Sequence, residues 1–209
     1  MGHLRTGLAN GVAAVLTVGS ASAQTAYDGT YWGFALGAGS ATFEGSAANL
    51  VGATSGGARA SGLVGWNTSR GDMVYGVEGS LGLAAMDGSV PCFNTDWICT
   101  SSVAAVVIAR GRIGQVFGSN LVYVTAGFAG AKFELATVLN TTDSTFPDSV
   151  TDFGYLVGAG IERISEGGWN LRAEITLVEF GASDYQLDRT YGDMDATMTA
   201  LDFSLIRRF

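Results

Sequence analysis

The last thirteen residues of the chain, 197–209, read TMTALDFSLIRRF and set the pattern for the whole sequence. Apolar and polar residues alternate through this stretch, which is the signature of a β-strand because successive side chains point to opposite faces. One face carries Leu201, Phe203, Leu205 and the terminal Phe209, and the other carries Asp202, Ser204 and Arg208. Arg207 falls on the apolar face and departs from the pattern. The segment is predicted to be a strand with one apolar and one polar face.

Seven earlier segments alternate in the same way, and the connections between the eight segments differ in length. The segments cover residues 30–41, 58–67, 72–84, 103–116, 120–133, 151–164 and 169–180. Three connections are short and turn-like, at 68–71, 117–119 and 165–168, whereas the links near 42–57, 85–102, 134–150 and 181–196 are long and polar. Short turns at one end and long loops at the other are typical of an up-and-down barrel in an outer membrane.

A bilayer explains why the sheet should close. Backbone polar groups in lipid must be paired within the protein, so only helices and closed barrels span a membrane. No segment beyond the N-terminus is predicted to be a membrane-spanning helix, because 113–131 is interrupted by Gln115, Gly118, Ser119 and Asn120. Segments of about 10 to 14 residues suit a tilted crossing. The sequence therefore predicts an all-β, eight-stranded antiparallel transmembrane barrel with short periplasmic turns and long extracellular loops.

The N-terminus is predicted to be a signal peptide, residues 1–23. A charged head with Arg5 precedes a short apolar run that ends on Ala21-Ser22-Ala23, where a signal peptidase needs small side chains. The alternative is a buried N-terminal helix. The barrel domain would then cover residues 24–209, with 10 basic against 19 acidic residues, a net charge of −9. This acidity argues against nucleic-acid binding, and the only histidine, His3, would leave with the signal.

Charged residues on the polar face of several strands are predicted to face the lumen. They are Glu78, Arg110, Arg112, Glu162, Arg172, Glu174, Asp202 and Arg208. An arginine that faces lipid at the midplane costs about 2–4 kcal/mol, and pairing inside the barrel avoids that cost. Adjacent strands should bring Glu78 near Arg110 and Arg112, and Glu162 near Arg172. Because four acids face four arginines, an ionic plug is favoured over a gate or a binding site.

Two cysteines, Cys92 and Cys99, lie in one predicted extracellular connection. A disulfide is plausible in an oxidising periplasm. Two free thiols or a metal pair are the alternatives, but a structural zinc site lacks further cysteine or histidine ligands. No metal site is predicted.

Four segments together resemble a known family: 74–79 (VYGVEG), 109–114 (ARGRIG), 122–127 (VYVTAG) and 157–162 (VGAGIE). The sequence is similar to the outer-membrane β-barrel domain of alphaproteobacterial surface proteins, which is related in architecture to OmpA-like and OmpX-like barrels and to the porin family. The resemblance covers most of the chain beyond the signal peptide. It implies an eight-stranded barrel in the outer membrane of a Gram-negative bacterium, inserted by the barrel-assembly machinery. Leu201, Phe203, Leu205 and Phe209 match the C-terminal assembly signal of such proteins.

Several functions remain open at this point. A structural or surface-interaction protein with a plugged ionic interior is expected first, and a narrow porin-like channel for small solutes is the alternative. A soluble, lipocalin-like periplasmic barrel is a further reading. An enzyme is not expected, because no histidine remains and the lumen carboxylates lie beside arginines. No cofactor is expected. The expected partners are outer-membrane lipid, lipopolysaccharide and the barrel-assembly machinery, and the acidic loops offer a surface for an extracellular ligand.

Overall fold

Eight long strands account for nearly all of the described chain. The computed structural model describes residues 25–45, 53–92, 94–165 and 167–209, so the predicted signal peptide lies outside the described residues. The strands are β1 (Gly29–Gly45), β2 (Ala53–Arg70), β3 (Met73–Pro91), β4 (Trp97–Phe117), β5 (Asn120–Leu139), β6 (Ser144–Ile164), β7 (Trp169–Gln186) and β8 (Thr190–Arg208). The 3-10 turn η1 (Thr25–Tyr27) precedes them, and no helix in these ranges is long and apolar enough to cross a membrane.

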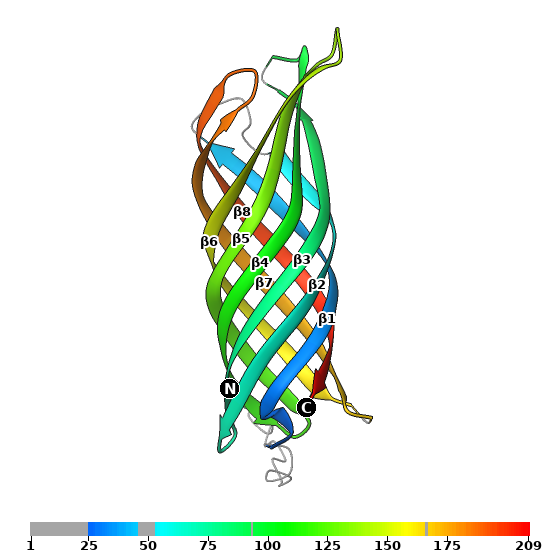
Figure 1. The fold of residues 1–209 in the computed structure, drawn as a ribbon, viewed down its shortest axis with the longest axis vertical. Helices are drawn as coiled ribbons and strands as arrows, with labels where there is room; N and C mark the ends of the chain where they lie inside the picture. Colours follow the sequence, from blue (N-terminus) through cyan, green and yellow to red (C-terminus); the bar gives the residue numbers. More distant parts are fainter. Residues whose placement is uncertain (1–24, 46–52, 93, 166) are drawn as a thin grey trace, which may run out of the picture.

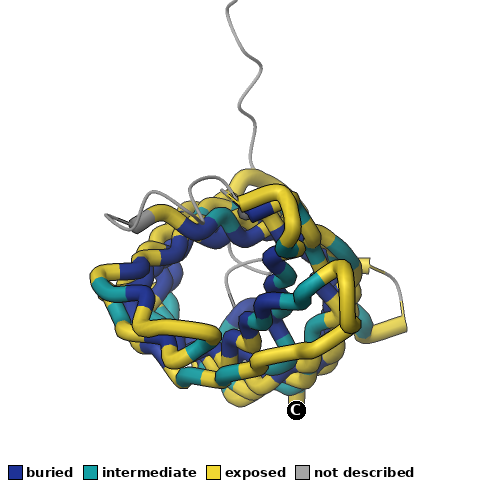
Figure 2. Tube along the Cα trace, turned by 90° about the horizontal axis from the view of Figure 1, so that it is seen from above, coloured by how far each residue is buried: buried dark blue, intermediate teal, exposed yellow. Residues whose placement is uncertain are grey.

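The strands form a closed antiparallel barrel in sequence order (Figure 1). Each strand pairs with its neighbours in the chain, and β1 closes the ring against β8 from Tyr31↔Arg208 to Gly45↔Met194. Seen from above, the strands surround a single interior (Figure 2). This confirms the predicted fold class.

Tight turns connect the strands at one end of the barrel, which we call the turn end. Gly71 and Gly118 adopt positive φ angles of 58° and 61° between β2 and β3 and between β4 and β5. Glycine takes this conformation without steric cost. At the opposite, loop end the strands project as hairpins, and both described chain ends lie at the turn end (Figure 1).

The lower half of the barrel is apolar outside and polar inside. We call its outward-facing ring the apolar belt. On each strand it includes large, exposed apolar residues, such as Leu36, Val64, Leu83, Val107, Phe128, Phe153, Leu177 and Leu201. Leu83 is 74% exposed and Phe153 is 72% exposed. Such a ring is suited to lipid rather than to water.

The alternation inverts toward the loop end. In β8, Leu201 and Phe203 face outward and Asp202 faces inward, whereas higher up Thr197 faces outward and Met198 is fully buried. In β5, Val124 is outward in the belt, but Lys132 is exposed and Phe133 is buried above it. Polar residues outside and apolar residues inside are what a barrel in water needs. The upper part of the barrel therefore stands clear of the lipid.

This inversion explains why the strands run further than the predicted segments. The sixth strand begins at Ser144 rather than near residue 151, and the eighth begins at Thr190 rather than near residue 197. These additional residues have polar outward faces. They therefore lack the apolar alternation by which a lipid-facing strand is predicted from sequence. Much of each predicted extracellular connection is instead a strand hairpin that projects from the membrane.

Candidate functional site

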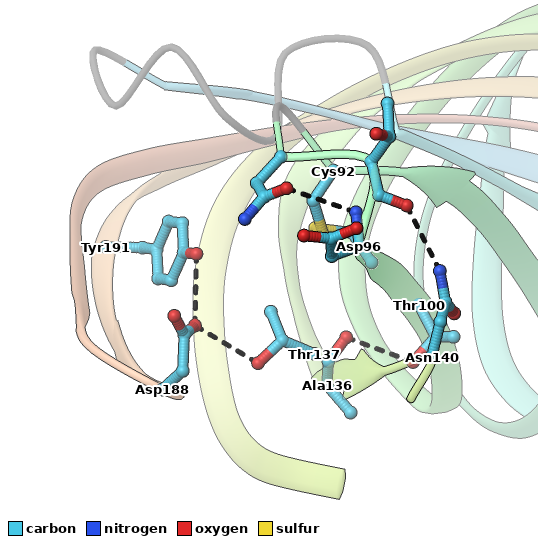
Figure 3. Close-up of a disulfide and its surroundings, with 11 residues drawn as sticks. Cys92, Asp96, Thr100, Ala136, Thr137, Asn140, Asp188 and Tyr191 are labelled. Carbon is cyan, nitrogen blue, oxygen red and sulfur yellow. Dashed lines mark hydrogen bonds between the residues drawn. A yellow bond between two sulfur atoms is a disulfide. The ribbon is translucent and has the colours of Figure 1, made fainter. Parts of the chain in front are cut away.

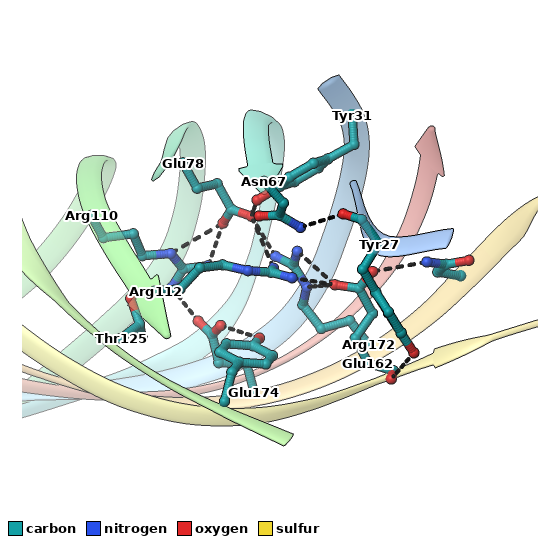
Figure 4. Close-up of polar contacts among 12 residues, drawn as sticks. Tyr27, Tyr31, Asn67, Glu78, Arg110, Arg112, Thr125, Glu162, Arg172 and Glu174 are labelled. Atoms are coloured by element: carbon teal, nitrogen blue, oxygen red, sulfur yellow. Dashed lines mark hydrogen bonds and ion pairs between the residues drawn. The ribbon is translucent and has the colours of Figure 1, made fainter. Parts of the chain in front are cut away.

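The candidate site is the ionic network in the lower lumen, where strands from all around the barrel bring charges together (Figure 4). The network consists of Glu78, Glu162 and Glu174 with Arg110, Arg112, Arg172 and Arg208. Strand register pairs Glu78 with Arg110, and Glu162 with Arg172. The alternation of each strand turns these side chains inward.

Glu78 lies at the centre of one half of the network. Arg110 donates to its Oε1 from Nη2 at 2.5 Å and from Nε at 3.1 Å. Arg172 Nη1 donates to its Oε2 at 2.6 Å, and the Tyr31 hydroxyl donates to the same oxygen at 2.8 Å. Both oxygens of this fully buried carboxylate are therefore occupied.

Glu162 is the centre of the other half. Its Oε2 accepts from Arg112 Nη2 and Arg172 Nη2, each at 3.0 Å. Its Oε1 accepts from Asn170 Nδ2 at 2.9 Å and from Arg208 Nη2. Arg172 therefore joins the two halves, because it contacts both Glu78 and Glu162.

Glu174 extends the network toward the loop end. It forms an ion pair with Arg110 and accepts a hydrogen bond from the Tyr123 hydroxyl, while Thr176 Oγ1 donates to it at 3.1 Å. Arg110 thus links Glu174 to Glu78. The result is one connected set of charges across the barrel.

Asp202, the remaining predicted lumen acid, has a separate partner. Arg59 Nε lies 3.3 Å from its Oδ1, and both side chains are largely buried. The sequence analysis did not identify Arg59. Its orientation follows from strand pairing in the structure, because Ala60 pairs with Leu36 and Leu83, which both face outward. Its neighbour Arg59 must then face inward.

Two tyrosine rings support the arginines from the sides. Arg112 lies over the Tyr123 ring at 4.7 Å and near the Tyr31 ring at 5.4 Å. Each ring requires a glycine on an adjacent strand, because a Cβ on Gly65 would collide with Tyr31 and one on Gly160 with Tyr123. The high glycine content has a specific structural role at these two places.

A tyrosine closes the network toward the turn end. The Tyr27 hydroxyl lies 2.9 Å from the carbonyl oxygen of Ser119 and 3.0 Å from that of Glu162. Its own carbonyl accepts from Asn67 Nδ2 at 3.0 Å and Arg208 Nη1 at 2.8 Å. Burial raises the pKa of Tyr27 to about 12, so its hydroxyl stays protonated and continues to donate.

Apolar side chains fill the lumen above the ionic network. We call this group the upper core: Phe43, Met86, Phe133, Leu135, Leu156, Val178, Phe180, Tyr185, Tyr191, Met194 and Met198, with smaller residues between them. The Phe133 ring lies 5.3 Å from that of Phe43 and 5.0 Å from that of Phe180, in edge-to-face contacts. Both halves of the lumen are therefore occupied by side chains.

A disulfide joins Cys92 and Cys99 at the loop end, with their Cα atoms 5.3 Å apart (Figure 3). The closed hairpin is also tied to the β5–β6 connection, because Asn140 donates from its backbone N–H to Asp96 O at 2.9 Å and from Nδ2 to Thr95 O at 3.1 Å. Thr137 Oγ1 of β5 in turn donates to Asp188 Oδ1, in the β7–β8 connection, at 3.1 Å. Cross-links of this kind hold the projecting hairpins together.

The C-terminal residues Leu201, Phe203, Leu205 and Phe209 all face outward and are exposed. They complete the apolar belt on β8 beside β1 and β7. Arg207 lies on the same face at the turn end, where its guanidinium lies over the Trp169 ring and donates to Gly167 O at 3.0 Å. Arg207, which departs from the alternating pattern, therefore lies at the turn-end rim of the belt.

Comparison with known proteins identifies the family. The protein-family model described as the outer membrane protein β-barrel domain matches residues 11–209 of this sequence. The chain belongs to this family. It is an outer-membrane protein of a Gram-negative bacterium, as the resemblance implied.

Two curated relatives carry outer-membrane names. The chain is 33% identical to the 22 kDa outer membrane protein of Rhizobium leguminosarum bv. viciae over 126 residues, which cover 60% of this chain and 54% of the relative. It is 27% identical to the 25 kDa outer-membrane immunogenic protein of Brucella abortus over 132 residues, or 63% and 56% of the two chains. The matched regions therefore span about half the length of these relatives.

A solved structure shares the fold of this outer-membrane barrel. The outer membrane protein OprG of Pseudomonas aeruginosa superimposes with a TM-score of 0.51 at 10% identity, covering 88% of this chain and 97% of that one. At this level of identity the likeness concerns the fold alone.

Proposed function

We propose that this outer-membrane barrel is a structural and surface-interaction protein whose lumen is closed along the barrel axis. The observation that carries the proposal is the connected ionic network, in which Glu78, Glu162 and Glu174 are each held by arginines from several strands. An ion moving along the axis would have to break these pairs. Removing one partner of a buried pair typically costs about 3–5 kcal/mol.

The upper core supports the same proposal independently. An ion that passed the network would next meet the apolar rings of Phe43, Phe133 and Phe180. Transfer of a charge into such surroundings is strongly unfavourable. A cavity between the two regions, beside Arg59 and Asp202, has a volume of only about 10 Å³, roughly one water molecule.

Permeability of reconstituted vesicles tests the closed lumen against the alternative, a narrow channel for small solutes. Liposomes that contain the protein should swell in an isosmotic solution of a small neutral sugar no faster than protein-free liposomes. Liposomes with a general porin serve as the positive control. Swelling at the rate of the porin sample would replace this proposal with the channel.

A non-enzymatic role follows from the same contacts. Glu78, Glu162 and Glu174 are each engaged by arginine guanidinium groups, so their carboxylate oxygens are not free to meet a substrate. We therefore assign the role of the protein to its surface. Its outward surroundings would be outer-membrane lipid and lipopolysaccharide at the belt, with extracellular molecules at the projecting hairpins.

The C-terminal strand supports a role for the barrel-assembly machinery in insertion. Leu201, Phe203 and Leu205 on the outside of β8, and Phe209 directly after it, present exposed apolar side chains that only Arg207 interrupts. Replacing Phe209 by serine should lower the amount of folded protein in the outer membrane, measured by heat-modifiable migration on a gel. An unchanged folded fraction would remove this residue from the proposed signal.

A further inference from the structure

Pairing between neighbouring strands does not reach the same height all the way around the barrel. Pairing of β6 with β7 ends at Gly154↔Phe180 among the described residues. In contrast, β5 and β6 stay paired up to Leu139↔Ser144, and β7 and β8 up to Gln186↔Thr190. The β5–β6 and β7–β8 hairpins accordingly diverge at the top of Figure 1, where Thr137 Oγ1 of β5 still donates to Asp188 Oδ1 of the β7–β8 connection. We call the unpaired boundary above Gly154 and Phe180 the seam.

The β7–β8 hairpin is irregular where the pairing of β7 with β6 ends. The register of β7 with β8 shifts between Phe180 and Ser183, with an extra residue in β7, and again between Ser183 and Tyr185, with an extra residue in β8. Extra residues of this kind bend a strand and increase its twist. They coincide with the separation of the upper part of β7 from β6.

The free edge of β6 has few groups that could re-form the ladder. Ser165 N–H donates to Trp169 O across to β7, so the odd-numbered residues of β6 direct their backbone groups toward the seam. Pro147 has no N–H to offer, and the N–H of Ser149 donates to the Asp148 carboxylate at 2.8 Å. Such features protect exposed strand edges, and here they keep the seam unpaired.

Two aspartates of β6 bridge the seam in place of a backbone ladder. Asp152 accepts from Ser183 Oγ and from the Tyr185 hydroxyl, the latter at 3.2 Å. Asp148 Oδ2 accepts from the backbone N–H of Gln186 at 2.7 Å. A hydrogen bond contributes only about 0.5–1.5 kcal/mol net, so this closure is weaker than a paired ladder.

The lower edge of the seam lies between the top of the apolar belt and the upper core. It begins beside Phe153, the uppermost residue of the apolar belt on β6. Immediately inside are the buried Phe180 and Leu156. At this edge the boundary is apolar on both sides, whereas higher up it is lined by polar residues such as Asp148, Asp152 and Ser183.

Methionines are concentrated in the upper core. Of the five methionines in the chain, Met86, Met194 and Met198 are fully buried there. Methionine is flexible and polarisable, and it repacks around different neighbours with little cost. The upper core can therefore reorganise around a small guest more readily than a core of branched residues.

We propose that the wall opens at the seam between β6 and β7, and that the opening admits a small, uncharged, apolar molecule from the outer leaflet into the upper core. The path is lateral and bypasses the ionic network, so the axis of the barrel stays closed to ions. This inference goes beyond the proposed function and does not depend on it.

A redox-controlled variant tests the seam. In Asp152→Cys/Ser183→Cys the two replaced side chains are in direct hydrogen-bond contact. Reduced, this protein lacks the Asp152 bridge; oxidised, it has a covalent one. The full chain in lipid vesicles is exposed to an apolar photoreactive diazirine, and labelled positions are mapped by mass spectrometry.

The expected result is position-specific. Labelling at Met194 and Met198 should be at least about fivefold higher in the reduced variant than in the oxidised one, and intermediate in the wild type. Labelling at the outward-facing Leu201 should not change, because it contacts lipid in every state. The wild type with and without reductant controls for the native disulfide.

A second cysteine pair controls for the effect of cross-linking itself. Ser102 and Glu134 are register partners on the fully paired β4–β5 boundary, so oxidising Ser102→Cys/Glu134→Cys should leave labelling at Met194 and Met198 as in the wild type. Equal labelling of these methionines in the oxidised and reduced seam variants would overturn the proposal. So would loss of labelling in the oxidised control pair.

Discussion

Glu78 is a residue whose burial is tolerable only because its partners are in place. Its carboxylate has no exposure to solvent and is held by Arg110, Arg172 and Tyr31. A charge taken out of water costs several kcal/mol unless hydrogen bonds and ion pairs satisfy it. The same reasoning applies to the arginines, which would be left with uncompensated charge if Glu78 were neutralised.

Replacing Glu78 by glutamine should lower the free energy of unfolding by about 3–5 kcal/mol, because Arg110, Arg112 and Arg172 lose a buried counter-charge. Unfolding by urea in lipid vesicles, followed by tryptophan fluorescence, gives this value. Glu134→Gln is the matched control, because the Lys132–Glu134 pair is about half exposed and should contribute no more than about 1 kcal/mol. A similar loss in both variants would contradict the assigned role of the network.

Gly65 and Gly62 provide a second comparison at the scale of single residues. A Cβ at Gly65 would collide with the Tyr31 ring, whereas a Cβ at Gly62 on the same strand would meet nothing within 4 Å. We expect Gly65→Ala to cost about 1–3 kcal/mol through overpacking and Gly62→Ala to be neutral or slightly stabilising. The same urea titration measures both, and equal effects would show that Tyr31 does not need this space.

At the scale of the strand, the inversion of the apolar pattern marks where lipid ends. Leu36 and Ser40 face outward on β1, four residues apart. Leu36 belongs to the belt, 68% exposed, while Ser40 lies above it. The two positions have the same strand and face but different surroundings.

Arginine substitutions test that boundary. Leu36→Arg should destabilise the folded barrel by about 2–4 kcal/mol, because the charge faces hydrocarbon, and Ser40→Arg by no more than about 1 kcal/mol. Folding yield into vesicles and urea midpoints report the difference. Equal costs at the two positions would place the membrane boundary elsewhere.

The disulfide hairpin behaves as an element of its own. Cys92 and Cys99 close a short loop, for which chain entropy predicts a local stabilisation of about 2–3 kcal/mol. Cys92→Ser/Cys99→Ser should increase protease cleavage between β3 and β4 without unfolding the barrel, as seen by limited proteolysis and heat-modifiable migration. Unchanged cleavage would show that the contacts of Asn140 alone hold the hairpin.

The sequence predicted the strands best where lipid dictates their pattern. Within the belt, alternation identified the inward side of Glu78, Arg172 and Asp202, because large apolar residues flank them at every second position. Above the belt it underestimated the strands, since water outside and packing inside reverse the pattern. Arg59 was overlooked because its neighbours are small residues, whose outward orientation emerges only from pairing with Leu36 and Leu83.

Long-range contacts were outside the reach of the sequence. The ion pair between Glu78 and Arg172 joins β3 and β7, on different sides of the barrel. The alternation of the sequence predicts only that both side chains face inward. The early end of the β6–β7 pairing coincides with register shifts between β7 and β8, which have no distinctive residue pattern. Such features follow from closure of the ring.

At the scale of the whole molecule, three regions follow one another along the barrel axis. The ionic network fills the lumen within the belt, the upper core fills it above, and the projecting hairpins present an acidic surface beyond. Charge is thus buried where the outside is lipid, and apolar bulk is buried where the outside is water. Under the proposed function, this arrangement would leave solutes without a path along the axis.

Single-channel recording in planar bilayers tests the closed lumen most directly. The purified wild-type protein should insert without producing steady open currents at neutral pH, while Glu78→Gln/Glu162→Gln, which releases several arginines, should show increased conductance if it folds. Long-lived open currents from the wild type, of the size expected for a water-filled pore, would contradict the account.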